Sequence, residues 1–482
     1  MTKAIKSIAD PKLHLEVLSL EQIEQVHQAS LQIIERTGVR FPSDWALDIW
    51  EEHGAEVDRE TQIIKASPDL IEEALQRCPP EYPLAARDPQ QDLPLDGNHV
   101  YLGTDGCGVQ VKDLQTGEIR TSALQDVREI ARVADQQPEI AFHWVPVSAQ
   151  DRPPETRGLH ELKAIWENST KHVQTESIYS LEEARASVEM ARILAGGSES
   201  LRERPPLSIM QCTTPPLGQD GGSLEAALVA AEAGLPVGFM TMTASLTTAP
   251  ATLAGNLAVG NAEVISAAAL IQLAYPGAPF FYAAAQTASD PRTGVYTGGG
   301  PEDFLFGAAT NKLADYYNMP LSMGSFATGA KEPNWQAGIE NSLSTFMASV
   351  VMSDMLLGAG LLHGSRIFSY EQLLMDCEIF DLVEHMMRGI EINEETLALN
   401  AVHAVGPGGN YLAQKHTRRH MRELWLPKYF DRRTYEEWER KGDDARDWAK
   451  EKAQQILETH QPEPLDPQIS AEFDRIIRSL EE

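Results

Sequence analysis

Between residues 138 and 390, short runs of β-forming residues alternate with longer segments that have helical periodicity, and this rhythm constrains the fold most. Such alternation indicates βαβ units and a parallel sheet. Seven strands and a weaker eighth at 366–368 favour a closed (β/α)₈ TIM barrel of the α/β class over an open sheet. The seven are expected at 140–147, 172–176, 207–212, 237–242, 280–284, 321–326 and 355–362.

The segments on either side of the barrel are predicted to be mainly helical. Residues 1–137 form an N-terminal extension, in which Ser43 and Ser67-Pro68 begin helices. Within it, the segment 100–111 and the turn Gln115-Thr116-Gly117 predict a β-hairpin. Residues 138–390 form the barrel, and residues 391–482 form a helical extension that packs on it.

Composition excludes several classes of function. The 482 residues carry a formal net charge of -31, which disfavours binding to nucleic acid or to an anionic membrane. The apolar run 249–275 is interrupted by polar residues such as Asn261 and Glu263, so a buried helix is expected there instead of a membrane span. The N-terminus has no secretory pattern, and the four cysteines are scattered. We therefore expect a cytoplasmic protein with reduced thiols.

The active site of such a barrel lies at the carboxyl ends of its strands. That rim is rich in Thr, Ser and Gln and has one carboxylate, Glu176, and one histidine, His363. It lacks the paired carboxylates of a glycosidase, a nucleophile elbow and a phosphate-binding loop. Cys212 has no second Cys or His at ligand spacing, so no metal is expected in this chain.

Several rim residues allow two interpretations. His363 is either a structural histidine or a contact to substrate or cofactor, and Glu263 either anchors its helix or meets a ligand. Glu176 either pairs with a neighbouring base or presents its charge on the rim. The rim aromatics either belong to the core or together form a cage for a cation that has no hydrogens to donate.

Four segments resemble the trimethylamine methyltransferase (MttB) superfamily: YLGTDGCGVQVKDLQTGE at 101–118, TTAPATLAGNLAVGNAEVISAAALIQLAYPGAP at 247–279, RTGVYTGGGPE at 292–302 and VGPGGNYLAQKHTRRHMRELWLPKYFDRRTYEEWE at 405–439. The resemblance implies a TIM barrel that methylates the cob(I)alamin of a separate corrinoid protein. The trimethylamine enzymes carry pyrrolysine, which we expect near 324–333, but that segment holds only ordinary residues. The chain is thus similar to the branch without pyrrolysine, which includes glycine betaine methyltransferases.

Leaving-group chemistry agrees with this branch. A quaternary ammonium leaves as a neutral tertiary amine and needs no special activation, so catalysis is mainly the positioning of methyl carbon and cobalt. The resemblance implies glycine betaine as the first candidate donor. The cobalt-binding pattern Asp-x-His-x-x-Gly is missing from this sequence, so the corrinoid must come with a partner protein.

The resemblance and the rim together suggest roles for individual residues. We expect His363 to be catalytic with support from Glu263. A cage for the ammonium is expected from Trp144, Tyr282, Tyr296 and Phe326, and contacts to the substrate carboxylate from Gln211, Thr241 and Thr243. Gly408, Gly409 and His416 are expected to close over the corrinoid cofactor.

Other interpretations remain open at this point. The substrate could be trimethylamine or another methylamine. The chain could instead be a methyltransferase or lyase without a corrinoid, or a barrel that binds a betaine without turnover. The apolar helix at 250–274 and the C-terminal tail are candidate surfaces for a homo-oligomer.

Overall fold

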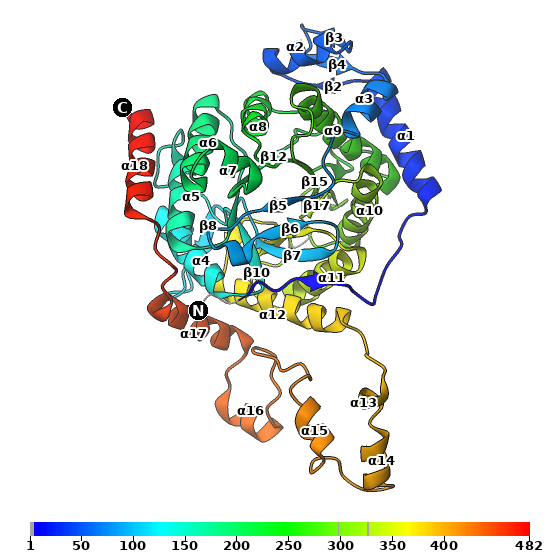
Figure 1. The fold of residues 1–482 in the computed structure, drawn as a ribbon, viewed down its shortest axis with the longest axis vertical. Coiled ribbons are helices and arrows are strands. Elements are labelled where there is room, and N and C mark those ends of the chain that lie inside the picture. The colour runs from blue at the N-terminus through cyan, green and yellow to red at the C-terminus, as the bar shows by residue number, and fades with distance from the viewer. Residues whose placement is uncertain (1–3, 297, 325–326) are drawn as a thin grey trace.

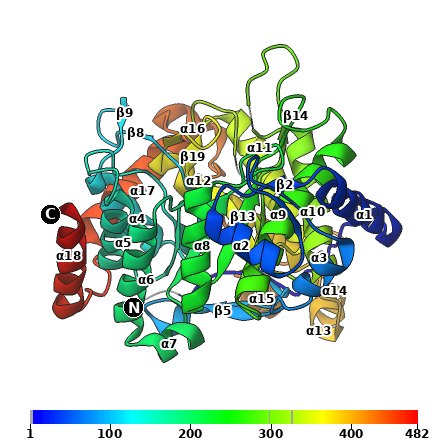
Figure 2. The same cartoon turned by 90° about the horizontal axis from the view of Figure 1, so that it is seen from above.

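The computed structural model describes residues 4–296, 298–324 and 327–482. Eight parallel strands form a closed barrel, because the last strand, β18, pairs with the first, β7. This confirms the predicted TIM barrel (Figures 1 and 2). In barrel order the strands are β7 (His99–Thr104), β10 (Ile140–Trp144), β11 (His172–Thr175), β12 (Leu207–Cys212), β13 (Val237–Thr241), β15 (Phe280–Ala284), β17 (Leu321–Met323) and β18 (Met355–Ala359).

The prediction of an eighth strand at 366–368 is wrong. That segment is β20 (Ile367–Phe368), which belongs to a small sheet with β19 (Leu361–Leu362), β8 (Gln110–Lys112) and β9 (Ile119–Thr121). The missing barrel strand is β7, which lies within residues 1–137, the segment predicted as an extension outside the barrel. The β8–β9 hairpin separates β7 from the helix that follows it, and this insertion hides the strand–helix alternation in the sequence.

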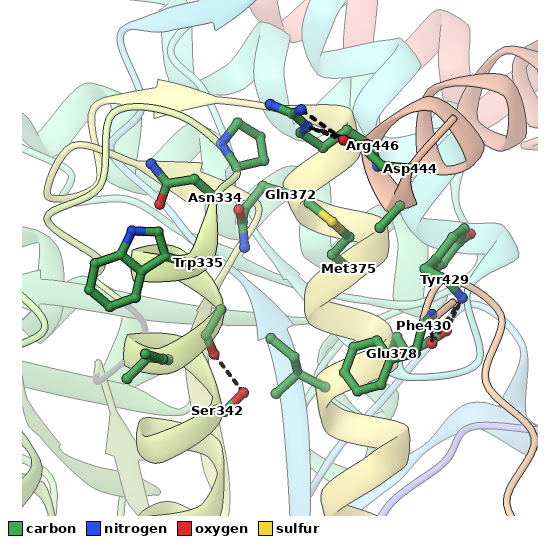
Figure 3. Close-up of a pocket in the computed structure, with 15 residues that line it drawn as sticks. Asn334, Trp335, Ser342, Gln372, Met375, Glu378, Tyr429, Phe430, Asp444 and Arg446 are labelled. Atoms are coloured by element: carbon green, nitrogen blue, oxygen red, sulfur yellow. Dashed lines mark hydrogen bonds and ion pairs between the residues drawn. The ribbon is translucent and has the colours of Figure 1, made fainter. Parts of the chain in front are cut away.

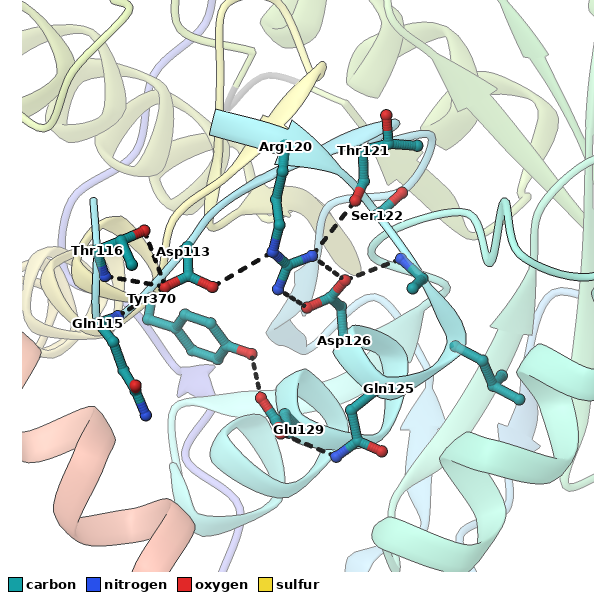
Figure 4. Close-up of polar contacts among 12 residues, drawn as sticks. Asp113, Gln115, Thr116, Arg120, Thr121, Ser122, Gln125, Asp126, Glu129 and Tyr370 are labelled. Atoms are coloured by element: carbon teal, nitrogen blue, oxygen red, sulfur yellow. Dashed lines mark hydrogen bonds and ion pairs between the residues drawn. The ribbon is translucent and has the colours of Figure 1, made fainter. Parts of the chain in front are cut away.

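Arg120 fixes this hairpin to the barrel wall (Figure 4). Its guanidinium donates two hydrogen bonds of 2.7 and 2.8 Å to Asp126 on α4 (Leu124–Gln136) and one of 3.3 Å to Asp113 in the hairpin turn. Asp126 also accepts the N–H of Ala123 and so caps the start of α4. The inserted hairpin is thus tied to the first helix of the barrel.

Eight helices follow the eight strands in turn, with one short extra helix, and surround the barrel. They are α4, α5 (Arg157–Asn168), α6 (Leu181–Ala195) with α7 (Ser198–Glu203), α8 (Gly221–Ala233), α9 (Leu253–Ala274), α10 (Pro301–Tyr317), α11 (Trp335–Val351) and α12 (Tyr370–Met387). α9 is long and apolar enough to cross a membrane, but 89% of its most apolar window is buried. The expectation of a buried core helix is confirmed.

Side chains on the strands alternate between two layers. One set fills the interior of the barrel, which we call the lumen; its members include Tyr101, Phe142, Trp144, Met210, Met240, Phe281 and Leu357. The other set, such as Phe239 and Phe280, packs toward the surrounding helices. This period of two fixes which residues of each strand can reach the open end of the lumen.

The N-terminal segment lies beside the barrel. Its helices α1 (Leu20–Arg36), α2 (Asp44–Glu52) and α3 (Pro68–Leu75) begin after Ser19, Ser43 and Ser67, whose side chains accept backbone N–H groups. The remaining short elements are β1 (Ile8–Ala9), β2 (Val39–Arg40), β3 (Glu56–Asp58), β4 (Ile63–Lys65), β5 (Tyr82–Leu84), η1 (Pro89–Gln91), β6 (Leu93–Leu95), β14 (Ala244–Ser245) and β16 (Thr287–Ala288).

The C-terminal segment combines two packed helices with a projecting part. α17 (Ala445–Thr459) packs on α12 and α4, and α18 (Pro467–Glu481) packs on α5 and α6. Residues 388–424, which we call the arm, contain α13 (Glu394–Leu397), α14 (Leu399–Val405) and α15 (Lys415–His420) and extend away from the barrel (Figure 1). The chain then returns through α16 (Tyr435–Lys441).

Candidate active site

The open end of the lumen, at the carboxyl ends of the strands, is the candidate active site, and we call it the mouth. Its functional groups come from the ends of several strands and from the loops that follow them. They are Asp105, Trp144, Glu176, Tyr179, Cys212, Tyr296 and His363.

Two carboxyl groups lie next to each other at the mouth. Asp105 follows β7 and accepts hydrogen bonds from the Ser365 hydroxyl (2.5 Å) and the Gly106 N–H (2.9 Å). Glu176 follows β11 and accepts the N–H of Cys107 at 2.5 Å. Burial raises the pKa of each carboxyl group to about 7, and the Asp105 charge contributes to the rise at Glu176. Near neutral pH both groups are therefore poised to ionise when a cation approaches.

A turn with unusual backbone geometry holds Asp105 from the other side. His363, Gly364 and Ser365 have φ angles of 58°, 61° and 61°, in the left-handed region that non-glycine residues rarely adopt. The N–H groups of His363 and Gly364 donate to backbone carbonyls in the 328–330 segment at 2.8 Å. These hydrogen bonds offset the backbone strain of the turn. The turn in this conformation places the Ser365 hydroxyl within hydrogen-bond distance of Asp105.

His363 itself lies in this turn at the rim and is half-buried. Burial, with the charges of Lys331 and Arg366, lowers the pKa of its imidazole, which favours the neutral form. His363 therefore lies two residues before Ser365, which bonds Asp105, and its imidazole can accept or donate a hydrogen bond.

Trp144 forms one wall of the mouth. The side chain is 5% exposed at the end of β10, and its indole N–H has no hydrogen-bond partner within the described residues. A Cβ atom added to Gly106 would lie 2.5 Å from the indole ring, so the glycine is what allows the loop after β7 to cross the ring. The close approach of Gly106 covers part of the indole ring and holds Trp144 in place as a wall of the mouth.

Two tyrosines reach the mouth from loops. Tyr179 is 63% exposed, and its phenol interacts electrostatically with Cys212 and Cys107. Tyr296 is 38% exposed; burial of its hydroxyl and the charges of Asp303 and Asp105 raise its pKa. Tyr179 borders the same cavity as Glu176, and Tyr296 borders a small cavity beside Ala284 at the end of β15, so both tyrosines lie next to strand ends of the barrel.

A cavity of about 150 Å³ adjoins the mouth and shares Glu176 and Tyr179 with it. Burial raises the pKa of Glu161 well above its usual range and that of Glu183 to about 7. The cavity also contains Arg157, whose buried Nε has no hydrogen-bond partner among the described residues. Three carboxyl groups and one guanidinium therefore face a small enclosed space.

Glu263 and two of the predicted threonine sites lie in the layer between the strands and α9. Glu263 is fully buried and accepts hydrogen bonds from Thr213 (2.6 Å), Thr241 (2.9 Å) and the N–H of Leu217 (2.8 Å), and burial raises its pKa to about 7. The Thr243 hydroxyl donates to Asn256 on α9 at 2.6 Å. This network anchors the loops after β12 and β13 from behind the wall, so Glu263 is a support for the rim.

Two more predicted contacts lie away from the lumen. The Gln211 amide is engaged with the backbone of Ile178, at 3.1 and 3.3 Å. The Tyr282 hydroxyl donates to Asn261 on α9 at 3.2 Å, and its ring packs in the core between strands and helices. The strand period that puts Phe281 inside puts Tyr282 outside, so Tyr282 does not face the mouth.

The remaining predicted residues fall in two places. Gly408, Gly409 and His416 lie in the arm, and the contacts of His416 are with Glu395 and His420 of the same arm. Phe326 lies outside the described residues. Of the predicted site, the structure brings Trp144, Tyr296 and His363 together at the mouth, along with Glu176, which the sequence singled out as a charge on the rim.

Asp105, Tyr179 and Arg157 were missed by the sequence analysis. Asp105 was assigned to a hairpin, although the pattern GTDG after a β-forming run is the signal of a strand end followed by a tight turn. Tyr179 and Arg157 follow strand ends by several residues, and only the loop geometry brings them back to the site.

A second cavity, of about 570 Å³, lies on the outer wall of the barrel (Figure 3). It is lined by Trp335 and Ile339 of α11, Met375 of α12, and Tyr429 and Arg446 from the C-terminal segment. It contains none of the residues of the mouth, and two of its charged lining residues, Asp444 and Arg446, pair with each other.

Comparison with known proteins identifies the family of this chain. Residues 1–481 match the family model described as trimethylamine methyltransferase (MTTB). The chain is 35% identical over 465 residues to the trimethylamine methyltransferase MttB of Desulfitobacterium hafniense (strain DSM 10664 / DCB-2), covering 96% of this chain and 93% of that protein. It is 32% identical over 464 residues to the glycine betaine methyltransferase of D. hafniense (strain Y51), with 96% of each covered.

The fold has a solved counterpart. The crystal structure of the hydroxylamine MtmB complex matches with a TM-score of 0.50 and 12% sequence identity, covering 95% of this chain and 92% of that one. At this identity the match shows the fold alone. The family model and the relatives that span nearly the full chain show more: this protein is a methyltransferase that belongs to the trimethylamine methyltransferase (MttB) family.

Proposed function

We propose that this enzyme transfers a methyl group from a quaternary amine, with glycine betaine as the first candidate, to the cob(I)alamin of a separate corrinoid protein. The observation that carries the proposal is the composition of the mouth. Asp105 and Glu176 lie beside Trp144, Tyr179 and Tyr296.

A quaternary ammonium group has no N–H to donate, so it is recognised by charge and by aromatic faces. The mouth offers both. Since burial holds the pKa of Asp105 and Glu176 near 7, an entering cation favours their ionised forms and is attracted in return. A neutral amine would not gain this attraction.

The adjoining cavity supports a substrate that also carries a carboxylate. Arg157 has an unused Nε among the described residues and faces the space that Glu176 and Tyr179 border. A guanidinium is suited to carboxylate recognition. We assign the ammonium end of the betaine to Glu176 and the aromatic rings, and its carboxylate to Arg157.

The reaction needs no acid or base. The methyl carbon–nitrogen bond breaks, the nitrogen keeps the electron pair and leaves as a neutral tertiary amine, and the reduced corrinoid supplies the nucleophile. The chain's part is to hold the methyl group in line and to exclude water. His363, neutral and at the rim, orients the substrate by a hydrogen bond, and Ser365 keeps Asp105 in place.

The rim also fits a partner protein that brings the corrinoid. Met242, Leu246 and Val295 are 44%, 51% and 58% exposed on loops around the mouth, which provides apolar contact area for a macrocycle and its carrier. The four cysteines are unpaired, in agreement with the reducing cytoplasm in which we place the enzyme.

The family also contains relatives named trimethylamine methyltransferases, so a methylamine is the competing substrate. All 482 positions of this chain are standard amino acids, and the mouth contains no unusual electrophile to capture a neutral amine. This difference favours the quaternary substrate.

The test is a spectroscopic assay of cob(I)alamin conversion to methylcob(III)alamin with a panel of betaines and methylamines. We expect conversion with a betaine and none with trimethylamine. Conversion with trimethylamine alone would contradict the leaving-group argument. Betaine binding without conversion, also in the presence of corrinoid proteins of the family, would show a binding protein instead of an enzyme of this reaction.

A further inference from the structure

The arm carries a cluster of metal-binding groups that the methyl transfer does not use. α15 presents His416 and His420 one helical turn apart, and their rings lie 4.2 Å from each other. Glu395 reaches them from α13. One ligand atom from each of the three residues lies within 4.8 Å of the other two, so small side-chain rotations would bring all three onto one ion.

We propose that Glu395, His416 and His420 bind a Zn²⁺ ion that holds the arm together. Imidazole nitrogens and a carboxylate oxygen are the donor set that Zn²⁺ takes in proteins, and three protein ligands leave a fourth tetrahedral position for water. Two histidines four residues apart on a helix present their rings to the same side, as a shared ion requires. This site departs from the expectation of no metal, which rested on the lack of a second Cys or His at ligand spacing from Cys212.

A further carboxylate orients one of the ligands. The two ring nitrogens of His420 have different partners: Nε2 lies 3.3 Å from Glu395 Oε1, and Nδ1 lies 2.8 and 2.9 Å from the carboxylate oxygens of Glu423. Metal-binding histidines commonly donate their second N–H to a carboxylate, which fixes the tautomer and strengthens the ligand. Glu423 is placed for this role.

The arm lacks a buried core that could stabilise it. No residue between 388 and 424, all of which the structure describes, is buried. Small segments without a core depend on a metal, a disulfide or a partner for stability. A bound ion would link Glu395 on α13 to His416 and His420 on α15, which are 21 and 25 residues further along the chain. Closing a loop of that length reduces the conformational entropy of the unfolded arm.

The carboxylate of Glu395 also has partners within the arm. Arg419 donates to Glu395, and His420 shares it. An ion would replace these exposed contacts, which contribute little on their own. The competing explanation is a surface network of hydrogen bonds and ion pairs without metal, and the experiment below separates the two.

The experiment uses the full chain, treated with a chelator and then dialysed against Zn²⁺ or Co²⁺. We expect roughly one ion per chain by mass spectrometry, and visible bands of tetrahedral Co²⁺. The variants His416→Ala, His420→Ala and Glu395→Gln should lose the ion. His403→Ala and Glu394→Gln, two exposed arm residues outside the cluster, are matched controls that should keep it.

Glu423→Gln gives a graded test, because it keeps all three ligands. We expect it to weaken Zn²⁺ affinity about 10- to 100-fold. Removal of the ion should also speed cleavage of the arm by protease while the thermal unfolding of the barrel stays the same, which shows that a variant has folded. The proposal is overturned if the chain takes up no stoichiometric ion, or if the ligand variants bind it as tightly as the controls do.

Discussion

The barrel and the arm differ most in how far their side chains are buried. Nearly every strand residue of the barrel is buried, whereas residues 388–424 contain no buried side chain and expose Ile390, Ile392 and Leu412 at 89%, 75% and 78%. Apolar burial stabilises the barrel, whereas the polar contacts of the arm are exposed and contribute little on their own. The rigid barrel can therefore position the reacting groups, whereas the exposed arm contributes no side chain to the mouth.

The mouth is rigid because its residues lie at the ends of the buried barrel strands. Its carboxyl groups stay buried because strand ends and a strained turn surround them, and their raised pKa values are a result of that burial. The arm places its acids and histidines in water, where they pair with each other. Four measurements can test this contrast between buried and exposed groups.

The same substitution should have very different effects in the two regions. Leu270 on α9 is fully buried, so Leu270→Ala should lower the free energy of unfolding by about 2–5 kcal/mol. Leu399 in the arm is 58% exposed, so Leu399→Ala should change it by less than about 0.5 kcal/mol. Denaturant titration measures both. Equal losses would mean that the arm packs against something in solution.

Glu176→Gln should weaken binding of a quaternary ammonium about 30-fold or more, because it removes one partner of a buried charge pair. The matched control is Glu182→Gln, an exposed glutamate on α6, which should leave the affinity unchanged. Calorimetry with glycine betaine and with tetramethylammonium measures the effect. An unchanged affinity in Glu176→Gln would remove this carboxyl from the site.

Gly106→Ala should lower the free energy of unfolding by about 1–3 kcal/mol and reduce methyl transfer, because the new Cβ would press on the Trp144 ring. Gly338→Ala on α11 is the control. Its Cβ would meet nothing within 4 Å, and a helical alanine is favoured over glycine by roughly 0.5–1 kcal/mol. Thermal and denaturant unfolding of both variants compare the crowded mouth with the open helix surface.

The affinity for a quaternary ammonium should rise about 10-fold between pH 6 and pH 8, in line with the ionised fraction of a carboxyl group whose pKa is near 7. The sign follows from burial, which raises the pKa: ionisation increases with pH, and the cation binds the ionised form. For the ligand-free protein, the same raised pKa values mean that stability falls as pH rises through 7. A double variant Asp105→Asn, Glu176→Gln should show a flat profile.

The strand–helix rhythm was enough to predict seven barrel strands, because buried parallel strands are short apolar runs separated by amphipathic helices. It failed for β7, where the β8–β9 hairpin lies between strand and helix. The helix starts at Ser43 and Ser67 were predicted correctly, because capping is a local property.

The site was harder to predict from sequence. The rule that strand ends carry function selected Trp144, Glu176 and His363, which do lie at the mouth. It also selected Tyr282 and Thr241, whose side chains point toward the surrounding helices. The position of a residue near a strand end does not show which face of the strand points into the lumen, and a shift of one residue exchanges the two faces. The two histidines of α15 form a candidate metal site only together with Glu395, and the sequence does not show that this distant residue lies beside them.

The most direct test measures methyl transfer from glycine betaine to free cob(I)alamin in three proteins: the unmodified chain, the double variant Asp105→Asn, Glu176→Gln, and the arm variant His420→Ala. Free corrinoid removes any need for docking of a carrier. We predict full transfer by the unmodified chain and by His420→Ala, and at least a 30-fold loss in the double variant, as expected for a lost buried charge contact. Loss of transfer in His420→Ala with transfer retained in the double variant would contradict the assignment of the mouth as the active site.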